Sequence, residues 1–174
     1  MNNVVIAQGA ARRTWVLLAS LLFAPVVSAC SEPGPQSMAD TGADAEIVVY
    51  KTPYCGCCHK WVEQLERDGL AVDAVNVQST ASIQTELGVP TSMRSCHTAK
   101  VGDYWVEGHV PPDLVEKLLE DKPEGIRGLA VPGMPVGSPG MEGPGAEPYD
   151  VMQVHADGSA SVYARREGRE FAPE

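Results

Sequence analysis

Three of the four residues at positions 55–58 are cysteines, in the order C-G-C-C. A short run of β-branched and aromatic residues, 46–51, precedes them and is typical of a buried strand. After the cluster, apolar residues recur at the spacing of one helical face, at Cys58, Trp61, Val62 and Leu65. The cluster is therefore predicted to lie where a strand passes into a helix, with Cys58 on the inner face of that helix.

The pattern continues beyond this first helix. Gly69 is positioned to end the helix, residues 70–77 are typical of a second strand, and residues 79–88 of a short second helix. The order strand, cysteine cluster, helix, strand, helix is the opening half of a thioredoxin-like fold. We therefore expect an α/β thioredoxin-like domain over residues 46–165.

The second half of the domain is predicted to carry an insertion and a long loop. Residues 95–99 and 104–110 are expected to be short extended segments, followed by a helix over residues 113–122, which together form an inserted β/α segment. Residues 123–148 contain seven glycines and six prolines, too many for a helix or a regular strand. Residues 149–164 predict a hairpin with its turn at Asp157-Gly158. Residues 166–174 are expected to be a polar tail.

The cysteine spacing is compatible with two kinds of chemistry. Cys55 and Cys58 have the C-x-x-C spacing of thiol–disulfide enzymes, in which helix N-terminal amides stabilise a thiolate. Cys55 and Cys57 have C-x-C spacing, which lets two thiolates converge on one soft metal. Thiolates select Cu(I), Zn(II) or iron–sulfur clusters. Zinc would require four donors, with Cys96 as the fourth. Two structural disulfides are an alternative that the crowding of the cluster disfavours.

Other donors are weaker candidates for the metal. Cys96 and His97 are predicted to lie in a strand with opposite side-chain directions, so only one can face the cluster, and Cys96 is favoured. His97 and His109 are therefore secondary candidates. Met134 and Met141 lie in the glycine- and proline-rich loop, where there is little core for a methionine to fill, so thioether donation to copper is a further hypothesis.

The first 45 residues predict export and anchoring. Arg12 and Arg13 precede a 13-residue apolar run, 15–27, which fits a signal-peptide core and is too short to span a membrane. Residues 27–30 (V-S-A-C) resemble the lipobox of bacterial lipoproteins. This implies that residues 1–29 are a signal peptide, that Cys30 is lipidated, and that residues 30–45 are a flexible tether. The protein is expected in the periplasm, held by lipid, with Ser31 favouring the outer membrane.

The charge of the chain excludes some partners. After Cys30 there are 11 basic and 23 acidic residues, a net charge of −12. This charge repels nucleic acid and anionic lipid headgroups, so neither is an expected partner. The membrane is expected to be reached through the lipid anchor alone.

Several motifs in order resemble the exported copper-resistance proteins of the CopG type. They are K-T-P-Y-C-G-C-C-H-K-W, G-V-P-T-S-M-R-S-C-H-T-A, V-E-G-H-V-P and G-L-A-V-P-G-M-P-x-G-S-P-G-M-E, and the resemblance extends over residues 46–164. The resemblance implies a thioredoxin-like fold, copper bound by Cys55, Cys57, Cys58 and Cys96, and partners in copper export or resistance. Thioredoxin-like folds also carry a cis-proline opposite the C-x-x-C site. Pro132 is the candidate for that position, and Pro90 competes with it.

The sequence thus favours an exported protein that holds Cu(I), in one or several ions, on clustered thiolates, with copper-linked redox as a further activity. Two alternatives stay open. One is a thiol–disulfide oxidoreductase with Cys55 and Cys58 as its catalytic residues. The other is a scaffold stabilised by zinc.

Overall fold

The computed structural model of the protein describes residues 46–171. Its elements, in chain order, are β1 (Ile47–Lys51), α1 (Gly56–Arg67), β2 (Val72–Asn76), α2 (Ala81–Glu86), the 3-10 helix η1 (Thr91–Met93), β3 (His97–Val101), β4 (Tyr104–Gly108), α3 (Pro112–Asp121), β5 (Ile126–Val131), β6 (Tyr149–His155), β7 (Ala160–Glu167) and β8 (Glu170–Phe171). Within this part of the chain no helix has the length and apolar character needed to cross a membrane. The predicted signal peptide, Cys30 and the tether lie outside the described residues.

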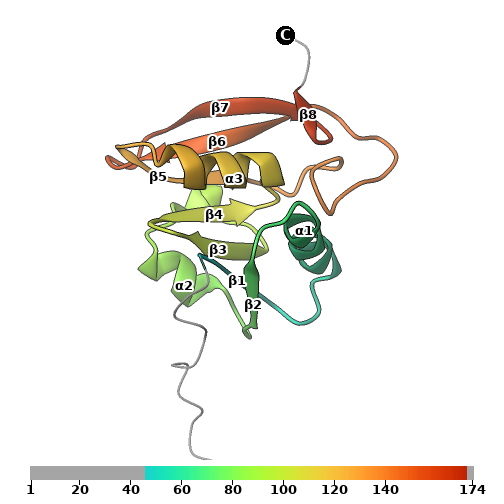
Figure 1. Ribbon diagram of the computed structural model, residues 1–174, viewed down its shortest axis with the longest axis horizontal. Helices are drawn as coiled ribbons and strands as arrows, with labels where there is room; N and C mark the ends of the chain where they lie inside the picture. Colours follow the sequence, from blue (N-terminus) through green and yellow to red (C-terminus); the bar gives the residue numbers. More distant parts are fainter. Residues whose placement is uncertain (1–45, 172–174) are drawn as a thin grey trace, which may run out of the picture. The chain divides into compact units, whose positions relative to one another are not determined.

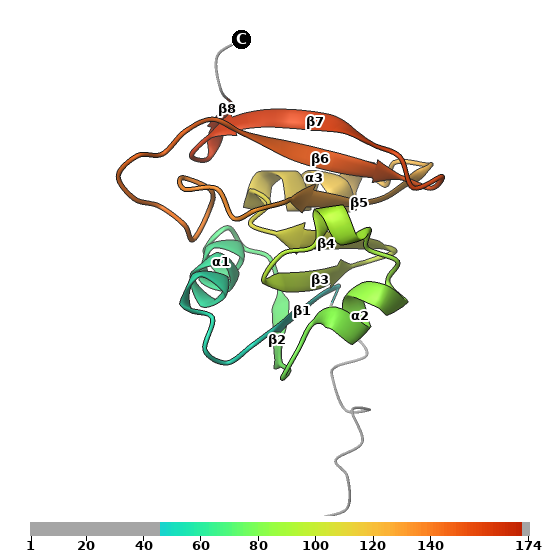
Figure 2. The same cartoon turned by 180° about the vertical axis from the view of Figure 1, so that it is seen from behind.

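The strands form one sheet in the order β2-β1-β3-β4-β5-β6-β7-β8. β1 pairs with β2 and β4 with β5 in parallel, whereas the other neighbouring strands are antiparallel. Helices α1 and α3 lie on one face of the sheet and α2 lies on the other (Figures 1 and 2). This confirms the predicted α/β, thioredoxin-like fold, with β5 to β8 extending the sheet beyond β4.

Each face of the sheet has its own apolar core. In the larger core, α1 and α3 pack on the sheet through residues such as Trp61, Leu65, Leu114 and Leu118. The smaller core, on the face of α2, contains Val89, Trp105, Ala130 and Val154. Neighbouring residues of β4 face opposite sides, since Trp105 belongs to the smaller core and Val106 to the larger. Burial on both faces fixes the register of the central strands.

Strand β5 corrects the prediction that residues 123–148 contain no regular strand. The residues from Gly128 to Val131 are buried, as expected for a parallel strand covered on both faces. Gly128 is required there, because a Cβ atom would collide with the carbonyl oxygen and ring of Trp105. The high glycine and proline content of residues 123–148 therefore hid the six residues of β5 near the start of this segment. The irregular loop is limited to residues 132–148.

The cis-proline prediction is wrong for Pro132 and for Pro90, because no peptide bond in residues 46–171 is cis. An X–Pro bond is trans by default unless its surroundings select the other isomer. Pro132 follows β5, two strands away from β3, which is the antiparallel neighbour of β1. The residue that directly precedes β3, and so lies opposite the cysteine cluster, is Cys96.

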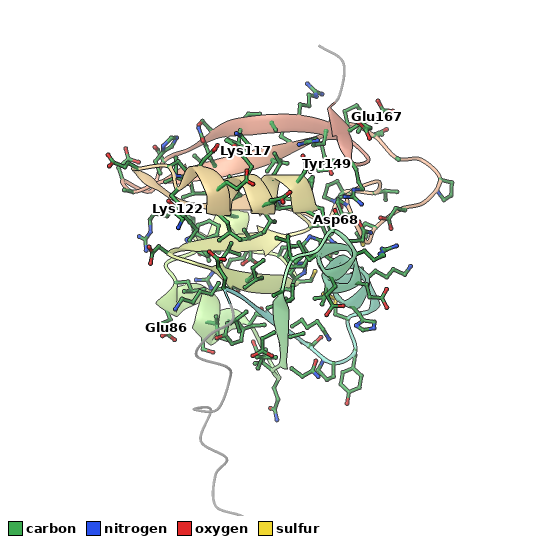
Figure 3. The ribbon with its side chains drawn as sticks, in the orientation of Figure 1. Asp68, Glu86, Lys117, Lys122, Tyr149 and Glu167 are labelled. Atoms are coloured by element: carbon green, nitrogen blue, oxygen red, sulfur yellow. A yellow bond between two sulfur atoms is a disulfide. The ribbon has the colours of Figure 1, made fainter. Side chains whose placement is uncertain are left out.

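The sheet continues past residue 165, where a polar tail was expected. β7 extends to Glu167, and β8 pairs with it. Arg166 is buried, with 2% of its surface exposed, and its guanidinium donates to the Asp113 carboxylate on α3 at 2.6 Å. The hydroxyl of Tyr149, which is labelled in Figure 3, donates to the Gly168 carbonyl at 2.6 Å. These contacts tie the end of the described chain to α3 and β6.

Candidate metal and thiol site

The cysteine cluster begins at the N-terminus of α1. Cys55 is the residue that caps this helix, and its sulfur accepts a hydrogen bond from the Cys58 amide at 3.4 Å. The first amides of a helix lack partners within the helix and carry partial positive charge. A sulfur in this position is therefore stabilised as a thiolate, which is the form that attacks disulfides and binds metals.

The four cysteine sulfurs of the domain meet at one place. Cys55 and Cys58 form a disulfide, with their Cα atoms 5.3 Å apart. The Cys57 sulfur lies 3.5 Å from that of Cys55, and the Cys96 sulfur lies 3.4 Å from that of Cys58. All four sulfurs lie within 4.8 Å of one another. With Zn–S bonds of about 2.3 Å, sulfurs around a tetrahedral ion are roughly 3.8 Å apart, so this spacing suits a thiolate metal site once the disulfide is reduced.

Cys96 is also in contact with two histidines. Its sulfur lies 3.4 Å from Nδ1 of His97 and 3.3 Å from Nε2 of His109. The expectation that only one of Cys96 and His97 faces the cluster is therefore wrong. Strand β3 begins at His97, so Cys96 lies in the preceding turn, where the alternation of strand side chains does not apply.

The tautomer of His109 is determined by the loop that covers it. Nδ1 of His109 lies 2.7 Å from the carbonyl oxygen of Pro139, which can only accept a hydrogen bond. Nδ1 therefore carries the proton, and the lone pair of Nε2 faces the Cys96 sulfur. A histidine that binds a metal through one nitrogen usually donates its other N–H to a carbonyl or carboxylate, as here.

Burial determines the charge state of these groups in the absence of a metal. It lowers the pKa of His97 to about 3 and lowers the pKa of His109. Burial, together with the neighbouring Cys57, raises the pKa of the Cys96 thiol to about 11. At neutral pH both imidazoles are therefore neutral, while Cys96 keeps its proton. A metal that binds Cys96 must displace that proton.

The loop after β5 closes over the cluster. Its residues 137–140 are buried. Gly140 has a φ of 84°, and a Cβ atom there would lie 2.7 Å from the Cys57 carbonyl oxygen and 3.0 Å from the Trp61 amide nitrogen. Only glycine combines this backbone conformation with so close an approach. Met134 is 40% exposed and Met141 is half-buried, and sulfur donation by either residue stays a prediction.

Glu107 of β4, which bonds to the residue before Cys96, was not predicted from the sequence. It is fully buried and accepts three hydrogen bonds, one of them from the amide next to Cys96. Burial raises its pKa, against the effect of these bonds. The available signal was an acidic residue within a run of strand residues, Y-W-V-E-G, because a glutamate in such a run is rarely buried without partners.

Each half of this domain matches a known protein family. Residues 47–92 match the glutaredoxin family, and residues 93–141 match a family described as a protein of unknown function, DUF411. Two solved structures, forms 1 and 2 of the copper resistance protein CopG, are 41% identical to this chain with TM-scores of 0.65. The matches cover 69–70% of this chain and 96–97% of the other. No curated protein matches the sequence.

Proposed function

The chain belongs to the family of the copper resistance protein CopG, and from this membership we propose that its cysteine cluster binds copper as Cu(I). The convergence of the sulfurs of Cys55, Cys57, Cys58 and Cys96 is the observation that carries the proposal. Thiolates are soft donors and favour Cu(I) over harder ions. The role follows from the binding: the protein withdraws copper from its surroundings and so contributes to copper resistance.

We propose that the site holds more than one copper ion. Cys96 belongs to two groups of donors, the four cysteines and the set Cys96, His97 and His109. Four thiolates in so small a volume repel one another, and each Cu(I) cancels one negative charge. Neutral imidazoles complete the donor set without adding charge.

Copper binding competes with the disulfide. Cys55 and Cys58 cannot act as two thiolate ligands while their sulfurs are joined. Loading the full cluster therefore requires prior reduction by an external dithiol, which supplies two electrons and two protons and itself becomes a disulfide. Copper then displaces protons from the thiols. The oxidised protein retains the free thiols of Cys57 and Cys96 beside the two histidines.

Titration of the full-length protein with Cu(I) tests the proposal. Fully reduced protein, kept without oxygen, is expected to remove more than one Cu(I) per chain from a chromophoric chelator. Protein with the Cys55–Cys58 disulfide intact should bind less copper and bind it more weakly, because two of the four thiolates are missing. Elemental analysis of protein isolated without oxygen provides the second measurement. Retention of zinc with no competition for Cu(I) would favour the zinc scaffold instead.

A thiol–disulfide oxidoreductase is the second candidate. The observation that favours it is the disulfide between Cys55 and Cys58 at a helix N-terminus, with the Cys58 amide directed at the Cys55 sulfur. In that reaction Cys55 attacks a disulfide of the substrate and Cys58 resolves the mixed disulfide. Such an enzyme needs neither Cys57 nor Cys96.

The anchoring of the protein is a separate proposal that rests on the sequence V-S-A-C at positions 27–30. We propose that Cys30 is acylated after removal of residues 1–29, which holds the domain at the periplasmic side of the outer membrane. Replacement of Cys30 by alanine is expected to move the protein from the membrane fraction to the soluble fraction. Replacement of Ser31 by alanine is the matched control and should leave it with the membranes. Membrane association that survives Cys30→Ala would contradict lipid anchoring.

A further inference from the structure

A buried polar network lies on the face of the sheet opposite α1. Its centre is Glu107 of β4, whose side chain has no exposed surface. One carboxylate oxygen accepts from the Ser95 amide at 2.5 Å and from the side-chain amide of Gln84 at 2.7 Å. The other oxygen accepts from the Thr98 hydroxyl at 2.6 Å. Three donors from three segments of the chain thus converge on one carboxyl group.

Both polar backbone groups of Ser95 form hydrogen bonds within this network. The Ser95 N–H donates to Glu107, and the Ser95 carbonyl accepts from the Gln84 side chain at 3.2 Å. Gln84 belongs to α2 and Glu107 to β4, so hydrogen bonds from two different elements hold the turn before β3. The next residue in the chain is Cys96, whose sulfur lies 3.4 Å from the Cys58 sulfur and 3.3 Å from Nε2 of His109.

From this arrangement we infer that Glu107 is the positioning residue for Cys96, acting with Gln84 through the backbone of Ser95. The inference rests on the proposed copper site and adds to it a residue that does not touch the metal. Cys96 lies in a turn, and no strand pairing fixes its backbone. Hydrogen bonds that hold a ligand without touching the metal orient it, and their loss commonly weakens metal binding about 10–100-fold.

Two substitutions of Glu107 separate its hydrogen bonds from its charge. Glu107→Leu leaves the Ser95 amide, the Gln84 amide and the Thr98 hydroxyl without their acceptor. Glu107→Gln retains a carbonyl oxygen for Ser95 and Gln84, and its NH₂ group can donate to the Thr98 hydroxyl. Cu(I) affinity is expected to fall about 10–100-fold in Glu107→Leu and to stay close to that of the unmodified protein in Glu107→Gln.

Thr98→Val is the matched control for loss of stability. It removes one bond of the same network but leaves the bonds to Ser95 in place. It should lower the stability of the fold and leave Cu(I) affinity unchanged. Gln84→Met, which removes only the contacts from α2, serves as a second test if Glu107→Leu does not fold. It should weaken Cu(I) binding in the same direction as Glu107→Leu.

A double-mutant cycle distinguishes positioning from general damage. In a Cys96→Ser background, Glu107→Leu or Gln84→Met should cause no further loss of Cu(I) affinity, while its effect on unfolding remains. Equal losses of affinity with and without Cys96, or full affinity in Glu107→Leu, would overturn the inference.

A measurement without metal tests the same inference independently of copper binding. With the Cys55–Cys58 disulfide intact, the rate at which iodoacetamide labels Cys96 is followed by mass spectrometry of its peptide. Glu107→Leu should raise this rate severalfold, whereas Glu107→Gln and Thr98→Val should not. Absence of Cu(I) binding in the unmodified protein would contradict the proposed function, but the labelling experiment would still test the role of Glu107. An unchanged labelling rate in Glu107→Leu would contradict the role of Glu107 itself.

Discussion

Replacement of Trp61 by alanine is expected to lower the free energy of unfolding by about 3–5 kcal/mol. Trp61 is fully buried between α1 and the sheet, and it is among the largest side chains of the core. Its indole N–H donates to the carbonyl oxygen of Val110 at 2.7 Å. Its ring centroid lies 4.4 Å from that of His97, so the same substitution opens a cavity beside the cysteine cluster. Chemical denaturation monitored by circular dichroism measures the loss.

Trp61→Phe is the matched control for this experiment. Phenylalanine retains an aromatic ring in the core but leaves the Val110 carbonyl without its donor, which costs about 1–3 kcal/mol. The free energy of unfolding should therefore decrease in the order unmodified protein, Trp61→Phe, Trp61→Ala. A loss below 1 kcal/mol in Trp61→Ala, on the order of a surface substitution, would show that α1 does not depend on this residue for its packing.

The local elements around the cluster could be predicted because short-range patterns determine them. The spacing of Cys58, Trp61 and Leu65 predicts the buried face of α1, and all three side chains have no exposed surface. The hairpin of β6 and β7 follows from alternating residues around Asp157-Gly158. Strand β5 was not predicted, because its pairing partners β4 and β6 lie across a helix and across the loop 132–148, which leaves no local signal among the surrounding glycines.

The composition of the site could be predicted only in part. The clustering of Cys55, Cys57 and Cys58 is visible in the sequence, and Cys96 could be added because it was the remaining cysteine of the domain. The position of His109 depends on the end of β4 and on the loop carbonyl of Pro139, which no periodicity connects. The partners of Glu107 could not be predicted for the same reason, since they come from α2, β3 and the turn between them.

Cys57 is the residue that separates copper binding from disulfide exchange. Its sulfur lies 3.5 Å from that of Cys55 and takes no part in the Cys55–Cys58 disulfide. A C-x-x-C enzyme has no use for a third thiol at this distance, which offers Cys55 a competing partner. A polythiolate site uses it as a ligand. Cys57→Ser is therefore expected to lower Cu(I) affinity at least tenfold, or about 1.4 kcal/mol. The reduction of a model disulfide by Cys55 and Cys58 should be largely unaffected.

Both activities are to be measured on the same anaerobic samples, with Cu(I) affinity determined against a chromophoric chelator and disulfide reduction followed separately. Cys96→Ser should behave like Cys57→Ser, since Cys57 and Cys96 are the two cysteines of residues 46–171 that lie outside the disulfide. Cys55→Ser should impair both activities, because its sulfur serves the disulfide and the metal group alike. The decisive result is the Cu(I) affinity of the Cys57→Ser and Cys96→Ser variants. If Cys57→Ser and Cys96→Ser both retain full Cu(I) affinity and only Cys55→Ser abolishes disulfide reduction, the protein is a thiol–disulfide oxidoreductase and the copper proposal fails.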